Sequence, residues 1–247
     1  MFKDYLLSLL EVDRFDNQSQ SAFRFWYDHI KNFANKKDGD IFEFGVYRGK
    51  SLIAAALILK KLKSKKKIFA FDTFKGFPSY SKQDEIKRFK DSKYFSKKII
   101  SEHQKFLEIK KFTTNLKKFN TSNISTSGNF NKTSINLIKK KIEYFNLKNI
   151  EIIEGDFAKT VPKFFNSYNK NISSCNIDCD LYDGYKIILP FVYPALSKGG
   201  YIHLDEYYSL KFPGPKIAVD NFCKKKNIKP KKNNTRKGEF ARYYLTK

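Results

Sequence analysis

The chain has few cysteines, and their placement argues against two common kinds of stabilised fold. Three cysteines occur in 247 residues, at positions 175, 179 and 223, and no two of them form a C-x-x-C pair. This pattern argues against a disulfide framework and against a zinc site. It favours small core residues of a protein in the reducing cytoplasm, which is the location we expect.

Long apolar runs are also missing. The longest, Leu52 to Leu59, is far shorter than the roughly 20 residues needed to cross a bilayer. Near the N-terminus a brief apolar stretch is followed by Glu11, Asp13 and Asp16 without a small-residue cleavage site, so no export signal is expected. The length suits one large α/β domain that buries a full core.

Acidic residues are scarce, at 25 Asp and Glu against 49 Lys and Arg, which gives a formal charge of +24. Lysine supplies most of the positive charge, spread along the whole chain, whereas nucleic-acid surfaces favour the planar fork of arginine. Nucleic acid is therefore a disfavoured partner, although a basic RNA-binding protein remains the alternative from a different class. The positive field attracts anions, so we expect an anionic small-molecule or glycan acceptor. The oligomeric state is left open, a homo-oligomer included.

Hydrophobic periodicity predicts an alternation of strands and helices behind an N-terminal helical segment, residues 1–38. The remainder, 39–247, is interpreted as one domain with a mobile, partly helical insertion at about 79–132. Strands are expected at 41–44, 67–71, 150–154, 173–178 and 201–205, with a closing pair at the C-terminus. Helices are expected at 51–62, 133–145, 160–167, 182–196 and 216–226, the fourth kinked or divided by Pro190 and Pro194. Strand–helix–strand order makes the sheet parallel.

Two of the predicted strands end abruptly in acids followed by an aromatic residue. One segment reads Ile177-Asp178-Cys179-Asp180-Leu181-Tyr182 and the other Ile202-His203-Leu204-Asp205-Glu206-Tyr207. In open α/β folds the carboxyl ends of the strands are where ligands bind. We predict that Asp178, Asp205 and Glu206 together hold one hard divalent cation, because gathered carboxylates otherwise repel.

The first strand leads into Glu43-Phe44-Gly45-Val46-Tyr47-Arg48-Gly49, where the glycines let the backbone pass close to a ligand. The loop lacks the G-x-G-x-x-G pattern of pyrophosphate-binding turns, and Glu43 would repel a pyrophosphate but would receive an ammonium group. Asp72, 27 residues after Gly45, is placed to bind a ribose diol. Gly155-Asp156-Phe157 offers an acid for a purine amino group and an aromatic ring to stack on it. A ligand with adenosine at one end and an amino acid at the other fits these features, namely S-adenosylmethionine.

Five segments together resemble the macrocin O-methyltransferase family of sugar-modifying enzymes. They run from Gly39 to Ser51, from Phe71 to Pro78, from Glu154 to Phe157, from Asp178 to Tyr182 and from Asp205 to Tyr207. The resemblance implies a Rossmann-like class I methyltransferase fold with a mostly parallel, seven-stranded sheet. It also implies S-adenosylmethionine as donor, Mg²⁺, and a sugar hydroxyl of a glycan precursor or glycosylated small molecule as acceptor. The family pattern has Asp-Asp-Tyr where this chain has Asp205-Glu206-Tyr207. The insertion of this chain is also longer and richer in lysine than the resemblance leads us to expect.

Together, these motifs yield a set of candidate site residues. The cofactor-binding candidates are Glu43, Gly45, Val46, Arg48, Gly49, Ser51, Asp72, Thr73, Phe74, Gly155, Asp156, Phe157 and Asp178. Arg48 is placed either to pair with the donor carboxylate or to tie its loop to a nearby acid. Asp178, Asp180 and His203 are the catalytic candidates. Asp180 is interpreted either as the general base or as a partner of a metal ligand. His203 is interpreted either as the general base or as a hydrogen-bond partner of a carboxylate, which is the more common role of a buried histidine. Same-fold enzymes acting on phosphorylated, nucleotide-linked or phenolic acceptors are the nearest alternatives.

Overall fold

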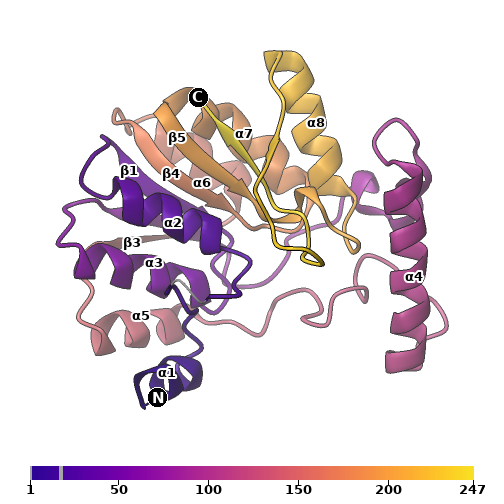
Figure 1. The fold of residues 1–247 in the computed structure, drawn as a ribbon, viewed down its shortest axis with the longest axis horizontal. Coiled ribbons are helices and arrows are strands. Elements are labelled where there is room, and N and C mark those ends of the chain that lie inside the picture. Colours follow the sequence, from indigo (N-terminus) through magenta and orange to yellow (C-terminus); the bar gives the residue numbers. More distant parts are fainter. Residues whose placement is uncertain (1, 17–18) are drawn as a thin grey trace.

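The computed structural model describes residues 2–16 and 19–247, and its centre is a seven-stranded sheet with helices on both faces (Figure 1). The strands are β1 (Asp40–Phe44), β2 (Ile68–Asp72), β3 (Ile150–Glu154), β4 (Ile172–Ile177), β5 (Leu196–Leu204), β6 (Lys231–Lys232) and β7 (Tyr243–Thr246). The α-helices are α1 (Phe2–Leu9), α2 (Arg24–Phe33), α3 (Lys50–Lys61), α4 (Lys97–Thr114), α5 (Ile135–Tyr144), α6 (Phe157–Phe165), α7 (Tyr182–Ala195) and α8 (Gly214–Lys226). Three 3₁₀ turns, η1 (Lys82–Asp84), η2 (Ile86–Lys90) and η3 (Asp205–Tyr207), complete these elements.

The sheet order is β3-β2-β1-β4-β5-β7-β6, in which the first five strands are parallel, β7 pairs antiparallel with β5, and β6 pairs antiparallel with β7. The chain builds outward from β1 in one direction through β2 and β3, and in the other through β4 and β5. The order therefore reverses between β1 and β4, and the crevice at such a reversal is where open α/β sheets bind ligands. The predicted mostly parallel sheet and its closing pair of strands are confirmed.

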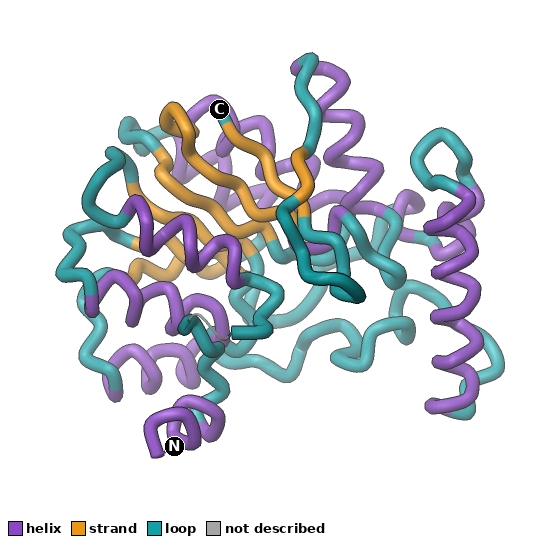
Figure 2. Tube along the Cα trace, in the orientation of Figure 1, coloured by secondary structure: helices purple, strands orange, loops and turns teal. Residues whose placement is uncertain are grey.

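Two hydrophobic cores, one on each face of the sheet, hold the layers together. Alternate residues of β1 point to opposite faces, so Ile41 joins the core under α2 and α3 whereas Phe42 and Phe44 join the core under α6, α7 and α8. Figure 2 shows these two helical layers flanking the strands. No helix in the described part of the chain is long and apolar enough to cross a membrane.

The region 1–38, expected to be helical, contains the helices α1 and α2, and its residues 1 and 17–18 lie outside the described part. Within the region 79–132, η1, η2 and the 18-residue helix α4 form, and a long loop then returns to α5 (Figure 2). The sequence indicated partial helicity there but did not locate α4, because its apolar residues do not follow a single stripe.

α7 is one helix and is not divided at Pro190 or Pro194: both prolines lie on its exposed side, while Tyr185 and Leu189 fix the opposite side in the core. A kink at these prolines stays a prediction. The strand expected at 201–205 begins earlier, because β5 starts at Leu196 and includes residues 197–200. A register shift between Ile172 and Ser174 of β4 absorbs the extra residues.

Candidate active site

A first cavity opens at the carboxyl ends of β1, β2 and β4, where the strand order reverses, and has a volume of about 350 Å³. Six of the cofactor-binding candidates line it, namely Gly45, Asp72, Thr73, Asp156, Phe157 and Asp178. The structure thus gathers residues from four separate sequence motifs around one space.

Gly45 is required by the way β1 meets β4. Its φ is +90°, and a Cβ added there would lie 1.7 Å from the carbonyl oxygen of Asp178. The amide of Asp178 donates to the carbonyl of Phe44 at 2.8 Å, which fixes this close approach. The glycine therefore allows the β1 loop and the acidic end of β4 to lie side by side.

Asp72 organises the glycine loop from the end of β2. Its Oδ2 accepts hydrogen bonds from the amides of Val46 and Tyr47 at 2.7 and 2.8 Å, and its Oδ1 accepts from the amide of Phe74 at 2.7 Å. Val46 and Phe74 are themselves buried and do not line the cavity. Asp72 thus shapes the loop as well as facing the cavity.

At the end of β3, Asp156 caps α6 by accepting from the amide of Ala158 at 2.9 Å, and Phe157 packs edge-on against Phe44. Both residues line the cavity, whereas Gly155 does not and its amide donates to the carbonyl of Asp72. The acid and the aromatic ring expected at this end of the site are present together.

Glu43 lies beneath the cavity and is fully buried. Ser51 at the start of α3 and the amide of Asn176 on β4 both donate to its Oε1, while Oε2 has no hydrogen-bond partner among the described residues. Burial raises the pKa of this carboxyl to about 7, against the opposing effect of those two donors.

Arg48 adopts the second of the two roles considered for it. Its Nε donates to Glu11 at 2.7 Å and its Nη1 to the carbonyl of Lys132 at 3.2 Å, so it ties the loop to neighbouring chain. Gly49 precedes α3 with a φ of +76° and faces Ile138. Neither residue lines the cavity.

Three acidic side chains meet beside this cavity. Asp178, Asp205 and Glu206 each present a carboxylate oxygen, and these atoms all lie within 4.8 Å of one another. Asp178 follows β4 and the other two begin η3, directly after β5, so the parallel strands deliver all three to one edge of the sheet. The structure brings these three residues together, and their binding of a divalent cation stays a prediction.

The electrostatics of these three residues, here called the carboxylate trio, suit a cation. Burial, then the charges of neighbouring acids, raise the pKa of Asp178 and of Glu206 well above their usual values. Burial also acts to raise the pKa of Asp205, but bonds from His203 and Glu206 and the charge of Arg242, 3.1 Å away, outweigh it and hold that pKa below its usual range. A bound divalent cation would relieve the repulsion, and an all-oxygen donor set is the kind that Mg²⁺ prefers.

Asp180 and His203 lie on different sides of the trio. Asp180 lines the first cavity, has a left-handed backbone with φ of +58°, and its pKa is raised to about 7 by burial and the charge of Asp205, against the effect of Lys211. His203 is fully buried, with Nε2 3.6 Å from Oδ1 of Asp205 and its ring against Phe23. His203 is placed to support Asp205 and does not line either of the two cavities described here.

The second cavity lies on the other side of the trio and is larger, at about 1050 Å³. Asp205 and Glu206 line it, whereas Asp178 and Asp180 line the first cavity. α4 and the chain around β6 and β7 form its other walls. The trio therefore stands where two spaces, opened by different elements, come together.

Several lining residues were not among the candidates. Tyr47, Phe77 and Phe130 contribute rings to the first cavity, with Phe130 5.2 Å from Tyr47 and 5.1 Å from Phe77 between ring centres. Phe130 comes from the loop that returns from α4. The motif containing Phe77 was recognised, but nothing in the pattern around Phe130 predicts its position.

Asp84 is another residue that sequence reasoning did not select. It is buried, its Oδ1 accepts from the amide of Tyr182 at 2.8 Å, and its Oδ2 accepts from the amide of Ser81. Burial raises the pKa of Asp84 to about 6. The contact fastens the region between β2 and α5 to the acidic motif after β4.

A mostly parallel sheet with a cavity at its strand reversal and acids at successive strand ends defines a Rossmann-like methyltransferase fold. A family model for macrocin-O-methyltransferase (TylF) matches residues 27–121 and 111–237. The chain belongs to this family, and it is an O-methyltransferase. No protein of curated function matches it in sequence.

Solved structures agree with this fold. The O-methyltransferase NovP is 18% identical with a TM-score of 0.61, covering 98% of both chains. The calicheamicin methyltransferase CalS11, also described as a TDP-rhamnose 3'-O-methyltransferase, is 19% identical with a TM-score of 0.60, covering 99% of this chain and 79% of its own. An O-methyltransferase from Bacillus cereus in complex with SAH is 12% identical with a TM-score of 0.51, covering 98% of this chain and 88% of its own.

Proposed function

We propose that this protein transfers a methyl group from S-adenosylmethionine to a sugar hydroxyl, with a divalent cation, Mg²⁺, held by Asp178, Asp205 and Glu206. The observation that carries the proposal is the position of the trio, which borders the first cavity through Asp178 and the second through Asp205 and Glu206. A donor in the first cavity and an acceptor in the second would meet at the three carboxylates.

The donor assignment rests on what the first cavity offers. Phe157 provides a face for a purine, Asp156 an acceptor for its amino group, and Asp72 a carboxylate for a ribose diol. Glu43 does not line this cavity, but its Oε2 has no hydrogen-bond partner among the described residues, and the ammonium group of a bound donor would favour its ionised form. The similarly folded Bacillus cereus enzyme contains SAH, which supports the same class of donor here.

The acceptor hydroxyl must lose its proton as the methyl group leaves sulfur. A cation held by the trio would lower the pKa of that hydroxyl and orient its oxygen. We assign the role of general base to Asp180, because it follows the trio member Asp178 by two residues and its charge acts on that of Asp205, so it is an acid beside the place where donor and acceptor would meet. His203 then holds Asp205 in position. The sugar assignment rests on the family to which the chain belongs.

The test is methyl transfer from labelled donor to a panel of glycosides, sugar nucleotides and phenols, with Mg²⁺ or with EDTA, followed by mass spectrometry of the product. Labelled sugar only when Mg²⁺ is present is the expected result. Asp205→Asn should lower the rate at least about 100-fold, while donor affinity stays within about threefold. Asp38→Asn, an exposed acid at the opposite end of the sheet, is the matched control and should keep full activity.

Undiminished turnover in EDTA would remove the metal from the proposal. Methylation of phenols but of no sugar would remove the sugar, and a protein that binds no S-adenosylmethionine would contradict the donor assignment.

A further inference from the structure

The second cavity has a distinct charge pattern. It lies between α4, which stands apart from the sheet in Figure 1, and the C-terminal chain, and it is lined by both signs of charge. The cationic residues are Lys98, Lys105, Lys211, Lys216, Lys232 and Arg242, and the acidic ones are Glu102, Asp205, Glu206 and Glu239.

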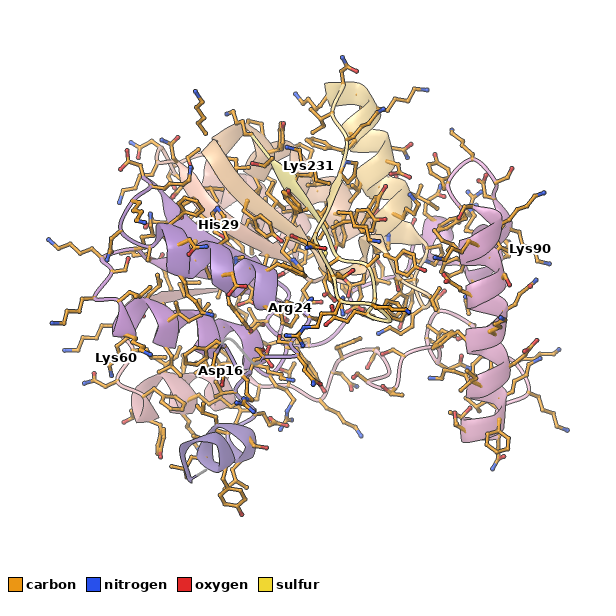
Figure 3. The ribbon with its side chains drawn as sticks, viewed as in Figure 1. Asp16, Arg24, His29, Lys60, Lys90 and Lys231 are labelled. Carbon is orange, nitrogen blue, oxygen red and sulfur yellow. The ribbon has the colours of Figure 1, made fainter. Side chains whose placement is uncertain are left out.

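Half of those cations already have an acidic partner. Lys98 pairs with Glu102, Lys216 with Asp220, and Arg242 with Asp205. The acid Glu239 is likewise engaged, by Arg24, which reaches it from α2 at 2.5 Å (Figure 3).

Lys105, Lys211 and Lys232 are the cations of this cavity that form no salt bridge to any residue in the described part of the chain. They come from three separate elements, namely α4, the loop after η3 and β6. Lys211 is only partly exposed, and although its charge lowers the pKa of Asp180, it forms no salt bridge with that acid among the described residues. Elsewhere the positive charge is dispersed, as Lys60, Lys90 and Lys231 illustrate in three separate parts of the molecule (Figure 3).

We propose that this cavity binds an acceptor that carries phosphate, with Lys105, Lys211 and Lys232 contacting the phosphate oxygens while the sugar hydroxyl lies at the carboxylate trio. This inference rests on the proposed function and specifies the class of its acceptor. Phosphate or diphosphate carries several negative charges on widely spaced oxygens. Three cations on separate elements can each contact one of these oxygens, whereas a single carboxylate offers only two oxygens and one charge. The exposed ring of Phe240, packed edge-on against Tyr208 in the same cavity, offers a surface for a sugar or a base.

The test uses inorganic pyrophosphate as the probe, titrated calorimetrically into the full chain at fixed ionic strength. EDTA is present and donor is absent, so that binding does not depend on a metal or on methyl transfer. The cavity variant is K105Q/K211Q/K232Q. Its matched control is K97Q/K111Q/K225Q, which removes the same charge at exposed lysines that do not line the cavity.

The cavity variant should bind pyrophosphate about 10- to 100-fold more weakly than the unaltered protein, and the control should stay within about threefold. Equal loss in both variants, or no loss in either, would overturn the proposal, because diffuse surface charge would then account for binding. Lys105→Gln alone, at an exposed position on α4, should give a smaller loss in the same direction, which keeps the test decisive if the triple variant does not fold.

A second arm separates the sources of phosphate. If a pyrimidine nucleoside diphosphate binds more tightly than pyrophosphate, and Phe240→Ala removes the difference, the acceptor is linked to a nucleotide. Equal affinities would identify the phosphate alone as the recognised group. Either result supports the proposal, and neither measurement depends on catalysis, so a failure of phosphate binding and a failure of methyl transfer to sugars are told apart.

Discussion

The hydroxyl group of Tyr185 lies 3.1 Å from Oε2 of Glu206 and 2.7 Å from the carbonyl oxygen of Ile177. Tyr185 is fully buried in α7, so one fixed side chain joins the end of β4 to the first turn after β5. Tyr185 therefore contacts both the segment that leads into Asp178 and the side chain of Glu206. Its contact engages Oε2 of Glu206 directly.

Tyr185→Phe removes this hydroxyl with little change of shape, and we expect it to weaken cation binding about tenfold. Groups that orient metal ligands from behind commonly have effects of this size. Titration with Mn²⁺ followed by electron paramagnetic resonance measures the affinity directly. Tyr193→Phe, on the same helix but away from the trio, is the control and should bind Mn²⁺ as the unaltered protein does. Unchanged affinity in Tyr185→Phe would show that the hydroxyl does not position Glu206.

Glu206 stands where the resembling family has Asp, and its extra methylene can be tested. Glu206→Asp should retain the rate to within about tenfold, because it keeps a carboxylate on the same backbone. Glu206→Gln should lose at least about 100-fold, because it removes the charge that a cation needs. Initial rates measured over a series of Mg²⁺ concentrations distinguish the two variants. Equal rates for Glu206→Gln and Glu206→Asp would exclude Glu206 as a metal ligand.

The parts of the site that follow from local pattern could be predicted from the sequence. Apolar runs that end in acids indicate buried strands with carboxylates at one edge of the sheet. The proximity of Asp178, Asp205 and Glu206 could therefore be predicted from the sequence. The parallel direction of the strands followed equally from the alternation of predicted strands and helices. In each case, a residue and its neighbours in sequence carry the information.

What could not be predicted depends on contacts between distant segments. The direction in which Arg48 points is decided by Glu11, and the ring of Phe130 is brought to the cavity by a loop whose path has no periodic signal. Glu43 shows a third case. Alternation along β1 turns it to the face covered by α3, where Ser51 engages it, rather than into the cavity itself.

Gly45→Ala tests the close approach of β1 to β4. The new Cβ would meet the Asp178 carbonyl oxygen at 1.7 Å, whereas at Gly238, with a similar φ of +83°, an added Cβ meets nothing within 4 Å. Both substitutions place alanine in an unfavourable backbone region, but only the first also forces atoms apart. We expect Gly45→Ala to lower the free energy of unfolding by at least about 2 kcal/mol more than Gly238→Ala, as measured by urea denaturation. Equal losses would mean that backbone strain alone accounts for the effect.

Glu43 should make stability depend on pH. Burial raises its pKa from 4.5 to about 7, so between these values the folded protein keeps a proton that the unfolded chain releases. The stabilising contribution is therefore fully present below about pH 4.5 and is lost as pH rises through about 7. Glu43→Gln cannot ionise and should be free of this loss.

The measurement is the free energy of unfolding of both proteins at pH 5 and pH 8.5. Relative to the unaltered protein, Glu43→Gln should gain about 2.5 kcal/mol between these two pH values, because each unit of pKa shift corresponds to about 1.4 kcal/mol and a small part of the loss has already occurred at pH 5. Glu154→Gln, an exposed glutamate at the end of β3, should gain nothing.

Saturating S-adenosylmethionine should reduce the gain of Glu43→Gln, because a nearby ammonium group favours the ionised carboxylate. An identical pH dependence in the two glutamine variants would contradict the raised pKa of Glu43.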